Sequence, residues 1–201
     1  MGNKDKICKN DYWRRLNNSW EESLQIRELL RSSPELSLLL MKYIGPTFCL
    51  SQYDYIYVPG NWDGSTTGSR GWHLDNHHMR VVKLFIPVHR ITKEHGATCV
   101  MNPKYSRIYA KYHPFNMPDI EVYKIGTGCN SPIKVIEMSA NDAFLIDTSR
   151  CLHMGGRSAK SRLFVVITFT GIASYCTNWP RNLIEPKVQQ TLFDVNSSLG
   201  F

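Results

Sequence analysis

From residue 47 onward the chain consists of short β-type segments separated by turn residues. These segments are rich in Val, Ile, Tyr and Phe, which favour strands. They cover residues 48–58, 81–89, 98–101, 107–112, 120–125, 133–138, 143–146 and 163–170. About eight short strands at this spacing predict a mainly β fold, either a barrel or a double-sheet jelly roll.

The N-terminal part has a different pattern, which predicts helices packed on one sheet. Apolar residues recur at three- and four-residue steps from Trp13 to Leu24, as on one face of a helix. Ser33-Pro34 matches an N-cap followed by a first-turn proline, and Gly45 ends this second helix. With 201 residues, 42% of them hydrophobic, one core and one domain are expected. The expected parts of this domain are a helical segment (1–46), a jelly-roll core (47–175) and a C-terminal extension (176–201).

Three potential metal ligands lie in two short motifs of the β-rich region. His73 and Asp75 are two residues apart, and such residues point to the same side of a strand, so both can reach one ion. His153 follows the β-type segment 143–146. Two imidazoles and one carboxylate form the facial ligand set of non-heme Fe(II) oxygenases, which leaves about three of six coordination positions open. An open site predicts catalysis, because structural metal sites are closed.

An arginine, Arg162, begins the last predicted strand, which is otherwise apolar. A guanidinium at this position needs an anionic partner, and a dicarboxylic cosubstrate would supply one. The alternative interpretation is that His73 and Asp75 form an ordinary surface pair and that His153 is a core histidine. An isolated His-x-Asp is common by chance, but the second histidine and the following arginine favour the metal site.

The segment 53–169 resembles Fe(II)- and 2-oxoglutarate-dependent oxygenases, specifically the phytanoyl-CoA dioxygenase-like family. The resemblance rests on Trp-His-Leu-Asp at 72–75, on the glycine, short β run and proline within 94–103, and on 141–169. The chain departs from the family at 104–106, where Lys-Tyr-Ser stands in place of the frequent Gly-Ser-His.

The resemblance implies a reaction and a set of site residues. Fe(II) would be held by His73, Asp75 and His153, and would bind 2-oxoglutarate and O2. Arg162 would bind the far carboxylate of 2-oxoglutarate, with Arg157 as a weaker candidate. The reaction would hydroxylate a C–H bond and release succinate and CO2, and the carboxylate at position 75 favours hydroxylation or another oxidation over halogenation. Further candidates are Tyr53, Tyr55 and Thr66 for the cosubstrate, and His77, Trp72, Tyr105 and Lys83 for the substrate side.

Several of these candidates also have a simpler structural explanation. Tyr53 and Tyr55 alternate along one predicted strand, where core or edge packing is favoured over contact with a ligand. Trp72 is expected to pack behind the first ligand, and a surface position is favoured for Lys83. The glycine- and hydroxyl-rich stretch 60–71 predicts a loop over the metal site.

Charge and composition bear on the partners. The net charge of +7 and a pI near 9.1 would suit an anionic partner such as a nucleic acid. The nucleic-acid demethylase branch usually carries a second arginine six residues after the first, and here that position is Thr168. A small-molecule substrate is therefore favoured, ahead of nucleic acid, a protein side chain, or a non-catalytic binding module.

The chain shows no sign of a membrane or secretory location. Its six cysteines are dispersed without a Cys-x-x-Cys pair, which predicts reduced thiols. The first residues lack the apolar core of a signal peptide, and no apolar run is long enough for a membrane span. A cytoplasmic location is expected, whereas oligomeric state has no readable signature.

Overall fold

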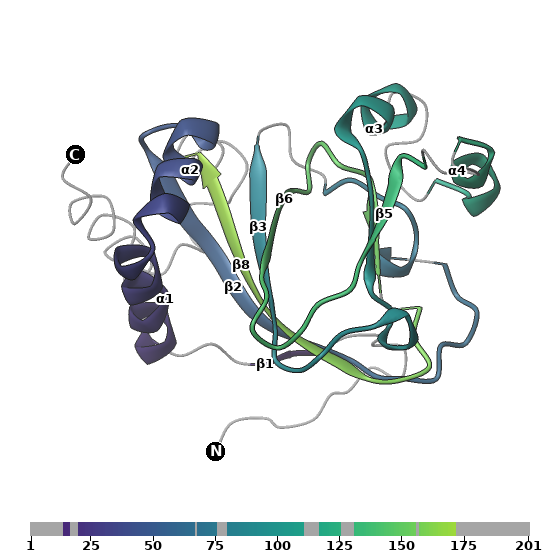
Figure 1. The fold of residues 1–201 in the computed structure, drawn as a ribbon, viewed down its shortest axis with the longest axis horizontal. Coiled ribbons are helices and arrows are strands. Elements are labelled where there is room, and N and C mark those ends of the chain that lie inside the picture. Colours follow the sequence, from purple (N-terminus) through teal and green to yellow (C-terminus); the bar gives the residue numbers. More distant parts are fainter. Residues whose placement is uncertain are drawn as a thin grey trace, which may run out of the picture.

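In the computed structural model, two antiparallel sheets stand opposite each other, with helices on their outer sides (Figure 1). The structure describes residues 14–16, 20–66, 68–75, 80–110, 117–125, 131–155 and 157–171. The larger sheet has the order β1 (Arg14–Leu16), β2 (Phe48–Val58), β8 (Arg162–Gly171), β3 (Val81–Pro87), β6 (Phe144–Asp147). The smaller sheet has the order β5 (Ile133–Ile136), β4 (Thr98–Met101), β7 (His153–Met154). The prediction of a mainly β fold is confirmed.

Two helices, α1 (Trp20–Ser32) and α2 (Pro34–Ile44), cover the outer face of the larger sheet (Figure 1). Leu30 and Leu40 are fully buried there against Phe48 and Phe169. The helix α2 begins at the predicted proline, although Ser33 makes no side-chain capping hydrogen bond. Burial of this apolar face removes side chains of both helices from water, which accounts for their position on the sheet.

The central strand β8 separates two environments by simple alternation. Ile167 and Phe169 point toward the helices and belong to the core beneath them. Arg162, Phe164 and Val166 point the other way and line a cavity that the smaller sheet also borders. Because successive side chains alternate across a strand, one strand supplies both the core and the wall of the cavity.

A β-bulge in β2 determines which of its side chains reach the cavity. The pairing with β8 shifts register between Leu50 and Gln52. Leu50 and Tyr53 therefore face the helices together, and both belong to the core on that side. Ile56 and Val58 face the cavity instead.

Three segments differ from the predicted secondary structure. Residues 14–16, predicted as helix, form β1 and pair with residues 55–57 of β2. Residues 107–110 and 120–125, predicted as strands, lie in α3 (Pro103–Ala110) and α4 (Asp119–Ile125). Their β-favouring side chains suggested strands, but local start signals override this preference.

The start of α3 illustrates such a signal. The Asn102 side chain accepts a hydrogen bond from the Lys104 backbone N–H at 2.9 Å, and Pro103 occupies the first helical position. Residues 111 and 112 of the same predicted strand lie outside the described residues, as does the predicted C-terminal extension, 176–201. Across the described parts of the chain, no helix is both long and apolar enough to cross a membrane.

Candidate metal site

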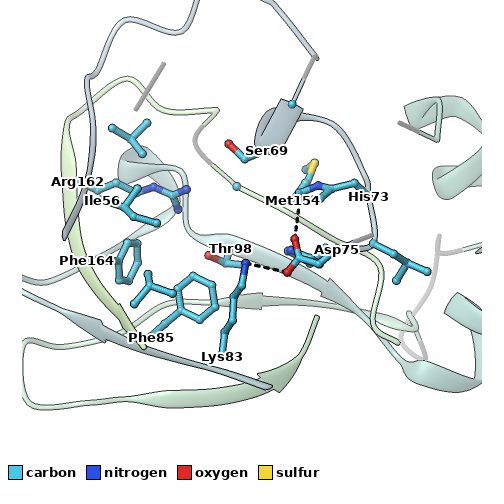
Figure 2. Close-up of a pocket in the computed structure, with 16 residues that line it drawn as sticks. Ile56, Ser69, His73, Asp75, Lys83, Phe85, Thr98, Met154, Arg162 and Phe164 are labelled. Carbon is cyan, nitrogen blue, oxygen red and sulfur yellow. Dashed lines mark ion pairs between the residues drawn. The ribbon is translucent and has the colours of Figure 1, made fainter. Parts of the chain in front are cut away.

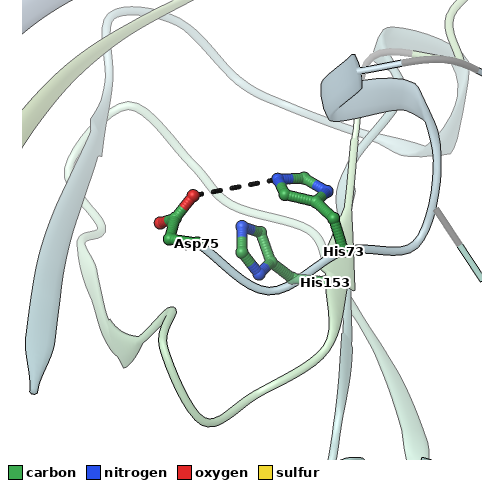
Figure 3. A group of neighbouring side chains, drawn as sticks. All are labelled: His73, Asp75 and His153. Carbon is green, nitrogen blue, oxygen red and sulfur yellow. Dashed lines mark ion pairs between the residues drawn. The ribbon is translucent and has the colours of Figure 1, made fainter. Parts of the chain in front are cut away.

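The three predicted ligands come together where the ends of two distant segments pair. The His73 backbone N–H donates to the His153 carbonyl, and the His153 N–H donates to the His73 carbonyl, both at 3.0 Å. The Asp75 N–H donates to the Thr148 carbonyl, also at 3.0 Å. One ligand atom from each of His73, Asp75 and His153 lies within 4.8 Å of the others. Figure 3 shows the three side chains pointing toward one another. The backbone pairing thus fixes the three side chains around one point.

Each histidine is oriented by a backbone carbonyl two residues before it. The distance from His73 Nδ1 to the Gly71 oxygen is 2.9 Å, and that from His153 Nδ1 to the Cys151 oxygen is 3.0 Å. A carbonyl only accepts hydrogen bonds, so Nδ1 carries the hydrogen in both rings. The Nε2 atoms then keep their lone pairs, as metal ligation requires.

The charge states also suit a cation. Burial, together with the neighbouring His73, lowers the pKa of His153 to about 4, so this imidazole is neutral near pH 7. Burial alone would raise the pKa of Asp75, but the Lys83 ammonium and other polar neighbours hold it below its usual range. Two imidazoles and one carboxylate make a donor set that fits a divalent transition metal.

The metal-free protein is expected to lose stability as the pH falls from about 7 to about 4. Unfolded His153 takes up a proton near its ordinary pKa of 6.5, whereas the folded residue does so near 4. Between these values the unfolded state binds more protons, so acid favours unfolding. Asp75 contributes mainly below about pH 4, because its unfolded carboxylate takes up a proton near the ordinary pKa of 3.8 and the folded one only at lower pH. Urea unfolding of wild type and His153→Gln at several pH values tests this, and equal slopes in both proteins would contradict it.

A cavity of about 500 Å³ adjoins the three ligands (Figure 2). Residues of both sheets line it, together with Gly68 and Ser69 from the short helix η1 (Gly68–Arg70). One wall is apolar and consists of Ile56, Val58, Phe85, Phe164 and Val166. The polar groups inside it are the ligands themselves and the side chains of Ser69, Lys83, Thr98 and Arg162.

Arg162 is buried in this cavity, with 7% of its surface exposed. Its Nη1 donates to the Gly96 carbonyl, and its guanidinium lies 5.2 Å from the centre of the Phe164 ring. Within the described part of the chain, its buried Nε has no hydrogen-bond partner. Burial lowers its pKa to about 10, so the group is still cationic near pH 7. A buried guanidinium with an unused donor fits a carboxylate ligand.

Gly155 leaves space for this guanidinium. A Cβ on Gly155 would lie 2.5 Å from Arg162 Nη2, so any side chain there would displace the arginine. The weaker candidate, Arg157, is engaged elsewhere: it forms a two-point ion pair with Asp119 and lies 5.5 Å from the centre of the Trp62 ring. The structure therefore favours Arg162 over Arg157 as the carboxylate anchor.

The structure does not bring the other predicted cosubstrate residues to the cavity. Tyr53 packs toward the helices, and Tyr55, two residues further along the same strand, is absent from the cavity wall. The bulge in β2 explains this, because it turns the odd-numbered positions away from the cavity. Thr66 is exposed and does not line the cavity either.

The predicted substrate-side residues also differ in whether they line the cavity. Trp72 is fully buried and packs against Met101, Met117 and Leu152, which agrees with a supporting role. Tyr105 lies on α3, is 37% exposed and does not line the cavity, whereas His77 is outside the described residues. Lys83, for which a surface position was favoured, lies inside the cavity.

Ser69, Thr98 and Phe164 also line the cavity, and sequence reasoning had not selected them. Phe164 could have been found, because it lies two residues from Arg162 on the same strand face. Ser69 falls in the predicted loop over the site, but nothing in the sequence distinguishes it from its neighbours. Thr98 depends on how the two sheets face each other, which strand patterns do not reveal.

Solved structures of similar architecture exist. EvdMO1 superposes with a TM-score of 0.51 at 18% identity, covering 82% of this chain. HygX from Streptomyces hygroscopicus, with nickel and 2-oxoglutarate bound, gives 0.50 at 13% identity over 80% of this chain and 70% of its own. Its complex with nickel, 2-oxoglutarate and hygromycin B gives 0.51 at 11% identity over 81% of this chain and 71% of its own.

The likeness establishes a shared fold. This chain spans only 37% of the EvdMO1 chain. No protein-family profile matches the sequence, and no curated protein matches it in sequence. A shared fold does not specify the chemistry, which depends on the residues of the site.

Proposed function

We propose that this chain is an Fe(II)- and 2-oxoglutarate-dependent dioxygenase with the double-stranded β-helix, or jelly-roll, fold. The observation that carries the proposal is the convergence of His73, Asp75 and His153 beside a cavity that also contains the buried Arg162. The nickel and 2-oxoglutarate bound by HygX, which shares the fold, support the same cofactors here. The motifs around 72–75 and 94–103 favour the phytanoyl-CoA dioxygenase-like family.

The chain's own residues have distinct tasks in this proposal. His73 and His153 would hold the iron through Nε2, and Asp75 would supply the anionic ligand. When bound, Fe(II) would activate O2 at the expense of 2-oxoglutarate, which leaves as succinate and CO2, and so provide the oxidant for a C–H bond. Arg162 would bind the far carboxylate through charge-assisted hydrogen bonds, which burial strengthens.

The cavity suits a small organic substrate. Its volume of about 500 Å³ lies within the range typical of small-molecule sites. The apolar wall, with Phe85 and Phe164, would keep water from the oxidised position. HygX binds hygromycin B, which supports a small molecule as the substrate class. Hydroxylation of a metabolite C–H bond is the reaction that we assign.

We extend this oxygenase domain over the whole chain. The helices α1 and α2 share one core with the larger sheet, which favours a single unit. Among the described residues, Cys99 and Cys151 are free thiols, which favours a reducing compartment such as the cytoplasm.

Anaerobic titration is the experiment that tests the function. Fe(II) and 2-oxoglutarate added to the protein are expected to produce the metal-to-ligand charge-transfer band of a chelated keto acid. Under air, succinate is expected to form in an Fe(II)-dependent manner. A protein that shows neither the band nor succinate with any substrate would be a binding module instead.

A further inference from the structure

A lysine pairs with the proposed carboxylate ligand from inside the cavity. Lys83 lies on β3 and points to the same side as Phe85, into the cavity, as Figure 2 shows. Its Nζ is 2.8 Å from Asp75 Oδ2, and the two side chains are 25% and 16% exposed. The neighbours Val82 and Leu84 alternate to the opposite face, into the core beneath the helices. Lys83 is therefore an ion-pair partner built into the site.

The two oxygens of Asp75 differ in their surroundings. Oδ2 is bound by Lys83, whereas Oδ1 faces His73 Nε2 at 3.9 Å. The Asp75 backbone is held by its hydrogen bond to Thr148. With its backbone and one oxygen both fixed, the carboxylate presents the other oxygen to the two imidazoles.

We propose that Lys83 is a positioning residue that keeps Asp75 a one-oxygen ligand. This inference rests on the proposed metal site. Two imidazoles and one oxygen leave about three of six positions, enough for a two-atom keto acid chelate and O2. If Asp75 turned to bind through both oxygens, one of these positions would be lost. Hydrogen bonds to ligating carboxylates commonly tune metal sites in this way.

A competing role for Lys83 is direct binding of the far carboxylate of 2-oxoglutarate, the task assigned above to Arg162. The two roles differ in their dependence on the ligand. A residue that binds the far carboxylate affects only keto acids that carry one. A residue that positions Asp75 affects every two-atom chelator, because it acts on the coordination positions. 2-Oxobutanoate, which ends in a methyl group, separates the two roles.

The test measures anaerobic binding of both keto acids to the Fe(II) protein by the charge-transfer band. Lys83→Met is expected to weaken 2-oxoglutarate and 2-oxobutanoate equally, by about 10- to 100-fold. Arg162→Met is expected to weaken 2-oxoglutarate alone. Selective loss of 2-oxoglutarate in Lys83→Met, or no change with either keto acid, would overturn the positioning role.

Two further variants make the result specific. Lys83→Arg restores a cationic donor and is expected to recover most of the affinity for both keto acids, so an Arg variant as weak as the Met variant counts against the proposal. Lys134→Met removes an exposed lysine from β5 and is expected to behave like wild type.

Loss of Fe(II) from folded Lys83→Met, with retention of Fe(II) in Lys83→Arg, would also support the role of Lys83 in positioning Asp75. Wild type without a band would refute the proposed function itself.

Discussion

The Asp75→Ala protein is expected to bind Fe(II) more than about 100-fold more weakly than wild type and to form no succinate above background. Loss of partners that merely orient a ligand already costs about 10- to 100-fold, and this change removes a ligand. It also removes the only anionic donor of the triad. Lys83, now without its carboxylate partner at 2.8 Å, would leave an uncompensated positive charge beside the incoming cation.

Metal titration with Fe(II) under anaerobic conditions measures the first effect, and succinate release measures the second. Asp142→Ala is a matched control, because it removes a carboxylate from an exposed turn outside the cavity. The control is expected to keep wild-type metal affinity. Wild-type Fe(II) affinity in Asp75→Ala would show that the His-Asp-His cluster is not the metal site.

The longer strands of the larger sheet, β2, β3 and β8, could be predicted well from the sequence because each is long enough to show its pattern. Residues 48–58 and 163–170 were expected as strands and correspond to β2 and β8. The two-residue strand β7 was not expected, since two residues carry no periodicity. The pairing of residues 14–16 with β2 depends on a contact between distant segments, which local pattern does not encode.

The site was predictable where chemistry restricts the residue type. The triad and Arg162 could be selected because imidazole, carboxylate and guanidinium groups are costly to bury without a purpose. The tyrosines could not be placed, because a single bulge reverses which side of β2 they occupy. Lys83 was predicted at the surface because its ion-pair partner, Asp75, lies on another segment of the chain. The pattern of β3 alone does not reveal such a contact. The sequence pattern therefore does not tell which side of a strand a residue occupies after a bulge, or how the two sheets pack against each other.

The Arg162→Met protein is expected to bind 2-oxoglutarate more weakly than wild type without losing stability in the ligand-free state. Two charge-assisted hydrogen bonds to a carboxylate are together worth about 3 kcal/mol or more, so 2-oxoglutarate should bind at least about 100-fold more weakly. Fe(II) binding should be unaffected, because the guanidinium is not among the ligands. Without ligands, however, the variant should melt no lower than wild type. The lowered pKa of Arg162, caused first by burial, means that the folded protein holds this cation at a cost.

Thermal melting of the Fe(II) proteins under anaerobic conditions tests both effects together. At 2-oxoglutarate equal to about 100 times the wild-type Kd, binding stabilises wild type by about 2.7 kcal/mol, a rise of roughly 5–10 °C in Tm. At the same concentration Arg162→Met should rise by only about 1 °C. Arg90→Met, which removes an exposed arginine, should keep the wild-type rise. A variant that melts far below wild type yet keeps the full rise would make Arg162 a structural residue. A variant that melts no lower than wild type but loses the rise would show that Arg162 serves the binding of 2-oxoglutarate. The cost of burying this cation in the ligand-free protein is then offset when the dicarboxylate binds.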